Sequence, residues 1–107
     1  MKRQLISLVL MLLPMVASAA VEIDSIYYKL NSQSKVAEVT NKPGWFGCYT
    51  GSIIIPEFVM YEGMTYSVKA IGDNAFYLCG KLTDIIIPNN VTSIGAFAFY
   101  GCRHLKE

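Results

Sequence analysis

The chain of 107 residues carries nine basic and eight acidic side chains, so it is close to electrical neutrality. Apart from Lys2 and Arg3, its lysines and arginines are scattered singly, whereas nucleic acids and anionic lipid surfaces require clustered ones. The composition therefore disfavours both kinds of partner, and the length allows one small domain.

The first twenty residues have the pattern of a secretory signal peptide. Lys2 and Arg3 form a positive start, residues 5–16 are an apolar run, and residues 17–20 are small (Ala-Ser-Ala-Ala). The alternative, an uncleaved anchor, is disfavoured because the run is shorter than the roughly 20 residues of a spanning helix. We therefore expect residues 1–20 to be removed, which leaves no membrane span and a protein that is secreted, periplasmic or at the cell surface.

Residues 21–50 are expected to form an N-terminal β-hairpin cap. Polar and apolar residues alternate over 23–40, and Asn31-Ser32-Gln33-Ser34 supplies a turn between the two runs. After Pro43-Gly44 comes a cluster of Trp45, Phe46, Cys48 and Tyr49. This cluster is too aromatic for a free linker, so we expect it to pack against the open end of the segment that follows.

Residues 51–107 contain two copies of one pattern, displaced by 23 residues. A period of 20–30 residues is typical of leucine-rich-repeat solenoids, whose repeats must stack to bury their apolar faces. The expected fold is mainly β, with parallel strands, short helical turns at Phe76 and Phe99, and the hairpin cap. The repeated residues, which we expect in the core, are Val68, Ile71, Gly72, Ala75, Phe76, Cys79 and Leu82, returning as Val91, Ile94, Gly95, Ala98, Phe99, Cys102 and Leu105.

The strand of each repeat is expected at Ile53-Ile54-Ile55-Pro56 and at Ile85-Ile86-Ile87-Pro88, which are 32 residues apart rather than 23. The nine extra residues lie within 57–66, where two β-prone runs flank Glu62-Gly63 and predict an inserted hairpin. Strand alternation directs Ile54, Asp84 and Ile86 away from the core. Exposed apolar residues stacked side by side indicate an interaction site, so these three are the candidate partner-facing residues.

The string Ile-Pro, Val-x-x-Ile-Gly, Ala-Phe-x-x-Cys-x-x-Leu resembles the BspA-type leucine-rich repeat of bacterial secreted and surface proteins. The resemblance covers residues 51–107, and the leader over 23–49 is similar to the N-terminal region of many such proteins. It implies a right-handed solenoid with a parallel sheet on its concave face, used in adhesion and protein binding. It carries over no catalytic residue and no cofactor.

Few residues could support chemistry. His104, the sole histidine, is near Cys102 in the sequence, but Cys102 occupies a repeat position that packing explains, so the chain is not expected to be an enzyme. Cys48, Cys79 and Cys102 show no close Cys-x-x-Cys pair, so no metal site is expected. We favour buried thiols at Cys79 and Cys102, with a disulfide between these two as the alternative. Tyr77 and Tyr100 also repeat and are expected to cover the convex side rather than form a carbohydrate platform.

The sequence thus predicts a non-catalytic, exported repeat protein that binds a protein of the host or the envelope. The alternative is an N-terminal fragment of a longer repeat protein with only a structural role. Because Leu105-Lys106-Glu107 matches the start of a strand, the last repeat is expected to leave an open edge through which the chain self-associates.

Overall fold

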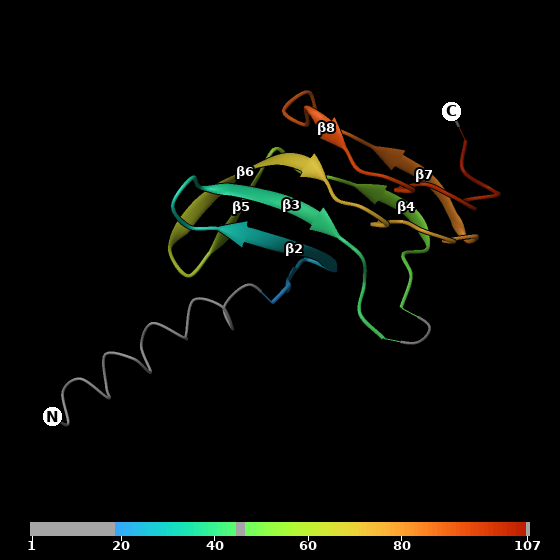
Figure 1. Cartoon of the computed structure of the whole chain (residues 1–107), viewed down its shortest axis with the longest axis horizontal. Helices are drawn as coiled ribbons and strands as arrows, with labels where there is room; N and C mark the ends of the chain where they lie inside the picture. Colours follow the sequence, from blue (N-terminus) through green and yellow to red (C-terminus); the bar gives the residue numbers. More distant parts are fainter. Residues whose placement is uncertain (1–18, 45–46, 107) are drawn as a thin grey trace, which may run out of the picture.

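The computed structural model describes residues 19–44 and 47–106, and these residues form strands and turns (Figure 1). Most of the expected signal peptide, as well as Trp45, Phe46 and Glu107, lies outside them. The strands are β1 (Val21–Ile23), β2 (Ile26–Asn31), β3 (Val36–Thr40), β4 (Gly51–Ile54), β5 (Phe58–Tyr61), β6 (Met64–Ile71), β7 (Leu82–Ile86) and β8 (Ser93–Ile94).

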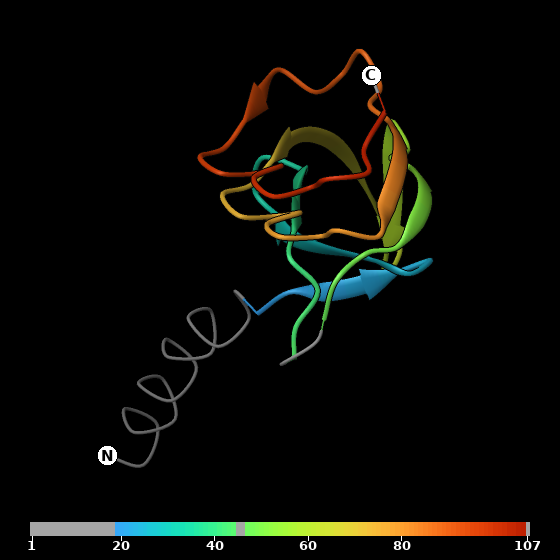
Figure 2. The ribbon, with the colours of Figure 1, turned by 90° about the vertical axis from the view of Figure 1, so that its right-hand side faces the viewer.

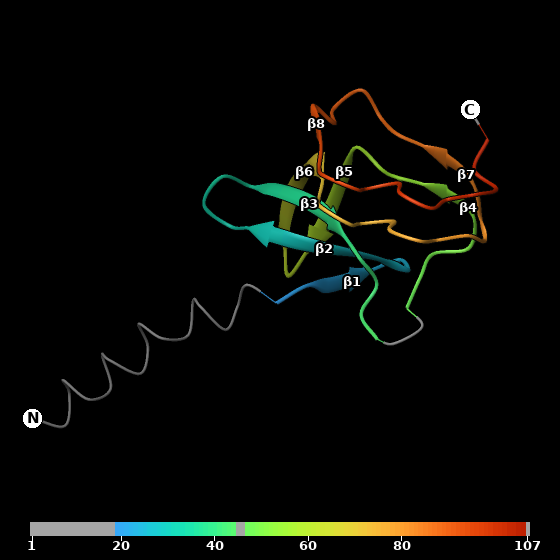
Figure 3. The same ribbon diagram turned by 45° about the vertical axis from the view of Figure 1, so that its right-hand side comes forward.

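Strand pairing divides the fold into two sheets on different sides of a common interior (Figure 2). The larger sheet has the order β1-β2-β3-β6-β5, with β8 also paired to β6. The smaller sheet contains β4 and β7, which run parallel. Figure 3 shows β1 beside β2 at one end of the large sheet and β4 beside β7. One hydrophobic core, in which Tyr28, Phe76 and Ile71 are among the largest fully buried side chains, fills the interior.

The chain passes through this architecture as three stacked coils. Each coil has a strand in the large sheet, then a turn, then a strand or extended segment beside the small sheet. Coil 1 comprises residues 36–44 and 47–54, coil 2 residues 68–86, and coil 3 residues 91–106. Strand β3 is parallel to β6, and β6 is parallel to β8, so the three coils follow one another in register.

Coil 1 extends the repeat further toward the N-terminus than the sequence pattern indicates. Ala37 and Val39 of β3 are aligned with Val68 and Ile71 of β6, and the Gly72 amide donates to the Val39 carbonyl at 2.8 Å. The offset between coils 1 and 2 is 31–32 residues because β5 and the first part of β6 form the inserted hairpin. The hairpin cap therefore supplies a parallel strand that completes the first coil.

The turns that join the strands are not helical, contrary to the expectation at Phe76 and Phe99. Coil 2 has left-handed backbone at Asn74 (φ 59°) and Leu78 (φ 57°), and coil 3 repeats this at Phe97 (φ 56°) and Gly101 (φ 78°). Two left-handed residues four apart prevent a helical turn from continuing. Instead the turns bond to one another across coils, since the amides of residues 74, 76 and 78 donate to the carbonyls of residues 96, 98 and 100.

Close stacking of the coils explains the repeated glycine. A Cβ atom at Gly95 would lie 2.5 Å from the Asp73 backbone nitrogen and 2.7 Å from the Gly72 carbonyl carbon. Real side chains do not approach backbone atoms so closely, so the position requires glycine because coil 2 occupies the space. The constraint is thus packing between coils rather than an unusual backbone conformation.

A disulfide joins Cys48 of coil 1 to Cys79 of coil 2, with the two Cα atoms 5.5 Å apart. The expectation that Cys79 is a free buried thiol is therefore wrong, and so is its alternative, a bond to Cys102. Stacking explains the pairing, because Cys48 precedes Tyr49 in the turn region of coil 1, at the level of Cys79. Cys102 of coil 3 remains a half-buried free thiol.

We predict that the double variant Cys48→Ala/Cys79→Ala is markedly less stable. The bond closes a loop of 31 residues, which corresponds to about 3–4 kcal/mol of denatured-state entropy and a melting temperature lower by at least about 10 °C. Differential scanning calorimetry of both proteins measures the difference. Cys102→Ala is the control, with a clearly smaller effect, and a Cys79–Cys102 peptide in a non-reducing digest would contradict the assignment.

A buried tyrosine ties the turn of coil 1 to the cap. The Tyr49 hydroxyl donates to the Thr40 carbonyl at 2.7 Å and accepts from the Tyr27 amide at 3.0 Å. Burial raises the pKa of Tyr49 to about 12 and, together with its charged neighbours, that of Tyr28 to about 12. Both hydroxyls therefore stay protonated in the folded chain at a pH that ionises them in the unfolded chain.

This difference predicts alkaline destabilisation. The unfolded tyrosines lose protons near pH 10 and the folded ones near pH 12, so stability holds below pH 10 and falls as the pH rises from 10 to 12. Tyr49→Phe should lower the free energy of unfolding by about 1–3 kcal/mol at neutral pH, because it leaves the Thr40 carbonyl and the Tyr27 amide without their hydrogen-bond partner. It should also make the decrease in stability between pH 10 and pH 12 smaller. Urea unfolding at pH 8, 10 and 11 measures both effects. Tyr77→Phe, which removes an exposed hydroxyl, should do neither, and parallel pH profiles for Tyr49→Phe and the parent chain would refute the explanation.

Candidate functional site

The outer face of the small sheet carries two exposed isoleucines side by side. Ile54 of β4 is directly paired with Ile86 of β7, and their exposed fractions are 66% and 59%. The preceding pair, Ile53 and Ile85, packs against the core. This alternation places the predicted partner-facing isoleucines on the solvent side of adjacent strands.

Asp84, the third predicted partner-facing residue, is half-buried. Its Oδ2 accepts hydrogen bonds from the Ser52 hydroxyl of β4 and from the Thr83 hydroxyl, each at 3.1 Å. The carboxylate therefore links the two strands and is held in a defined position beside the isoleucine pair.

The exposed apolar surface extends onto the inserted hairpin. Phe58 and Met60 of β5 are 55% and 66% exposed, whereas Val59 between them is buried. Together with Ile54 and Pro56 they line a groove of about 350 Å³, whose other wall comes from β1 and β2. We call Ile54, Ile86, Phe58 and Met60 the apolar face. Sequence reasoning missed Phe58 and Met60, although their alternation with Val59 and Tyr61 carries the same signal that identified Ile54.

The repeat residues differ in burial between coils. Those of coil 2 (Val68, Ile71, Phe76, Cys79 and Leu82) are buried, and those of coil 3 (Val91, Phe99, Cys102 and Leu105) are half-buried. Ile94 is 53% exposed, so its expected place in the core is wrong. Its register partner Ile71 lies between Val39 and Ile94 and so has a neighbouring strand on both sides, whereas Ile94 has a paired strand on one side only among the described residues.

Cys102 and His104 each contact a different backbone carbonyl group of coil 2. The Cys102 thiol lies 3.0 Å from the Phe76 carbonyl oxygen, and His104 Nδ1 lies 2.7 Å from the Gly80 carbonyl oxygen. Burial raises the pKa of the Cys102 thiol, which lowers the fraction of reactive thiolate. In the described part of the chain, no three His, Cys, Asp or Glu side chains are grouped so that they could hold a metal ion.

Within residues 19–44 and 47–106 there is also no helix long and apolar enough to cross a membrane. The described residues carry two surface features, the apolar face described above and a more polar groove on the side of the turns.

Solved structures of bacterial leucine-rich repeat proteins share this fold. A protein from Bacteroides ovatus matches 80% of the chain at 34% identity, with a TM-score of 0.70. A protein from Bacteroides capillosus also matches 80% of the chain, at 29% identity and with a TM-score of 0.65. A leucine-rich cell surface protein from Faecalibacterium prausnitzii matches 81% of the chain at 27% identity, with a TM-score of 0.52. The matches cover 22%, 61% and 29% of those chains, so this chain spans less than two thirds of each. No curated protein matches it.

The family match begins where the turn of coil 1 begins. The model of the BspA type leucine rich repeat region (6 copies) matches residues 47–107, which is more than half of the chain. The structural matches cover a larger share, so they must also include residues ahead of Gly47, where the hairpin cap lies. Because the family model matches more than half of it, the chain belongs to the BspA-type leucine-rich repeat family.

Proposed function

We propose that this chain is an exported, non-catalytic protein-binding module whose coils form a right-handed solenoid and whose apolar face contacts a protein partner of the host or the envelope. The family supports a binding role, and one structural match is described as a cell surface protein. The Cys48–Cys79 disulfide supports export, because such bonds persist in oxidising compartments. The signal-peptide pattern of residues 1–20 supports the same location.

The observation that carries the proposal is the exposed pair of Ile54 and Ile86. Both side chains contact water over more than half of their surface, whereas the other strand isoleucines of the described residues, apart from Ile94 of the last coil, are buried or half-buried. Complete burial of one such side chain contributes about 1.5–3 kcal/mol, so covering two of them supplies a useful fraction of a binding free energy. Asp84, fixed beside them, offers a charged group for orientation at the edge of the contact.

A structural role within a longer repeat protein is the alternative. It is supported by the small share of the compared structures that this chain spans. In that case the coils would serve to begin the stack, and the apolar face would have no partner of its own.

The binding proposal predicts the behaviour of Ile54→Ser/Ile86→Ser. Biotinylated mature chain, residues 21–107, is used to capture proteins from extracellular-matrix and envelope extracts, and the affinity for a captured protein is then measured by surface plasmon resonance. The double variant should bind at least about tenfold more weakly, because the apolar contact is lost. Its melting temperature should stay within a few degrees, since both side chains are exposed.

Two further variants make the result specific. Leu78→Ser removes an equally exposed apolar side chain (56%) outside the apolar face and should leave binding unchanged. Ile55→Ser places a hydroxyl at a 2% exposed position and should unfold or strongly destabilise the chain. Unchanged affinity for Ile54→Ser/Ile86→Ser, or no captured protein at all, would favour the structural role.

A further inference from the structure

A second groove, of about 790 Å³, lies where the turns of coils 2 and 3 meet β2 and the loop after β3. Its walls carry three aromatic rings, from Tyr77, Phe97 and Tyr100, and the polar residues Asp73 and Asn74 among others. The volume lies within the range of about 300–1,000 Å³ that is typical of small-molecule sites. This groove is separate from the apolar face, with which it shares no lining residue.

The aromatic rings form an ordered and exposed array. Tyr77 and Tyr100 stack with centroids 5.5 Å apart and planes 15° apart, and Phe97 meets Tyr100 edge to face at 5.8 Å. Tyr77 is 43% exposed, Tyr100 is 56% exposed and Phe97 is 64% exposed. Tyr100 of coil 3 thus stacks on the ring of Tyr77 of coil 2. Asn41 and Gly47 of coil 1 also line the groove.

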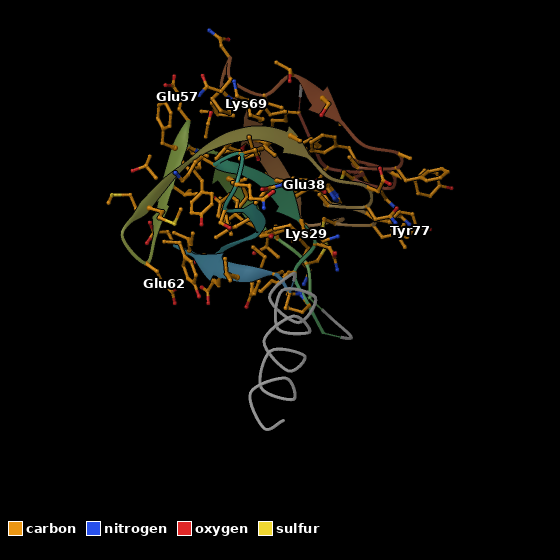
Figure 4. The ribbon with its side chains drawn as sticks, turned by 60° about the vertical axis from the view of Figure 1, so that its left-hand side comes forward. Lys29, Glu38, Glu57, Glu62, Lys69 and Tyr77 are labelled. Atoms are coloured by element: carbon orange, nitrogen blue, oxygen red, sulfur yellow. A yellow bond between two sulfur atoms is a disulfide. The ribbon has the colours of Figure 1, made fainter. Side chains whose placement is uncertain are left out.

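Hydrogen-bonding groups surround the rings. Asp73 Oδ1 accepts from the Ala96 amide at 2.8 Å, which fixes the carboxylate against the turn of coil 3. Asn74, the next residue, lines the groove from the same turn, and Lys29 lines it from β2. Figure 4 labels Lys29 on β2 and Tyr77 on the turn of coil 2. One carboxylate and one ammonium among the lining side chains leave the groove without net charge. This disfavours strongly anionic or cationic ligands.

The two grooves differ in the kind of apolar contact that they offer. No aliphatic side chain of Leu, Ile, Val or Met from the described residues lines the groove of the turns, whereas several line the groove beside Ile54. Protein partners bury aliphatic and aromatic side chains in apolar pockets. Flat rings alternating with hydroxyl, amide and carboxylate groups suit instead a ligand with a C–H face and a rim of hydroxyls.

The conformation of Phe97 is consistent with a binding role. This bulky residue adopts φ 56°, a left-handed value that is uncommon for residues other than glycine, asparagine and aspartate. The equivalent residue of coil 2 is Asn74, which tolerates that conformation. Phe97 therefore occupies an unfavourable backbone position while 64% of its surface stays exposed, so its burial in the core does not account for it.

We propose that this groove binds neutral pyranose residues of a glycan. The C–H face of a sugar ring packs on the exposed surfaces of the Tyr77, Phe97 and Tyr100 rings. Asp73 accepts hydrogen bonds from the sugar hydroxyls, and Lys29 and Asn74 donate to their oxygens. The groove of about 790 Å³ has room for more than one pyranose ring, so the expected ligand is an oligosaccharide rather than a single sugar. Tyr77 and Tyr100 thus have a role beyond the covering of the convex side that their repetition indicates.

The test uses the exported chain and four neutral hexasaccharides: maltohexaose, cellohexaose, mannohexaose and chitohexaose. Saturation-transfer difference NMR identifies binding, and isothermal titration calorimetry measures it. At least one hexasaccharide should bind saturably. Tyr77→Ala should then weaken binding by about tenfold or more, as expected for the loss of an aromatic stacking partner.

Matched variants separate a binding role from a structural one. Asn74→Gly removes the amide and keeps the left-handed backbone, and Lys29→Met removes the ammonium and keeps most of the chain length; each should weaken binding with little change in melting temperature. Phe58→Ala deletes an equally exposed ring on the apolar face and should leave sugar binding unchanged. Failure of all four sugars to bind overturns the proposal. Sugar binding that is unchanged in both Tyr77→Ala and Asn74→Gly also overturns it. So does a result in which no sugar binds but Tyr77→Ala loses the captured protein, since the groove would then bind a protein.

Discussion

The stacking of aromatic rings in the interior is the interaction on which the three coils depend. Phe76 is fully buried, with the ring of Tyr49 from coil 1 at 4.9 Å on one side and the ring of Phe99 from coil 3 at 5.2 Å on the other. A single coil of this size has no interior of its own, so its aromatic side chain is buried only when a neighbour is present. The cross-coil hydrogen bonds of the turns and the Cys48–Cys79 bond hold the rings at this spacing.

The same stacking produces two surfaces of different chemistry. In the small sheet, parallel register places Ile54 beside Ile86 and leaves their side chains on the solvent face. In the turns, it places Tyr77 beside Tyr100, with Asp73 and Asn74 at the edge. One surface is mainly aliphatic and the other combines rings with polar groups, which is why we propose a protein partner for the first and a sugar for the second.

The Cys48–Cys79 bond illustrates where a repeat pattern is informative and where it fails. The 23-residue offset relates Cys79 to Cys102, which suggests these two as neighbours in equivalent positions. The relevant neighbour of Cys79 is Cys48, 31 residues earlier, because the inserted hairpin lengthens the first interval. The 32-residue offset between Ile53 and Ile85 indicates this longer first interval. It points to Cys48 only if the segment before residue 51 is recognised as a coil. Its strand, β3, has a different sequence from β6 and shares with it only apolar character at two paired positions, Ala37 with Val68 and Val39 with Ile71.

The sequence by itself determined the repeat, the strands at residues 53–54 and 85–86, the inserted hairpin and the outward direction of Ile54 and Ile86. These follow from spacing and from the two-residue period of a strand, which are local properties of the chain. Only the tertiary structure decided that β3 is a parallel partner of β6, that the turns are left-handed rather than helical, and that Ile94 is exposed. These depend on which segments lie beside each other and on how many neighbours cover each side chain. The groove of Tyr77, Phe97 and Tyr100 likewise exists only because residues from β2, coil 1 and two turns meet in space.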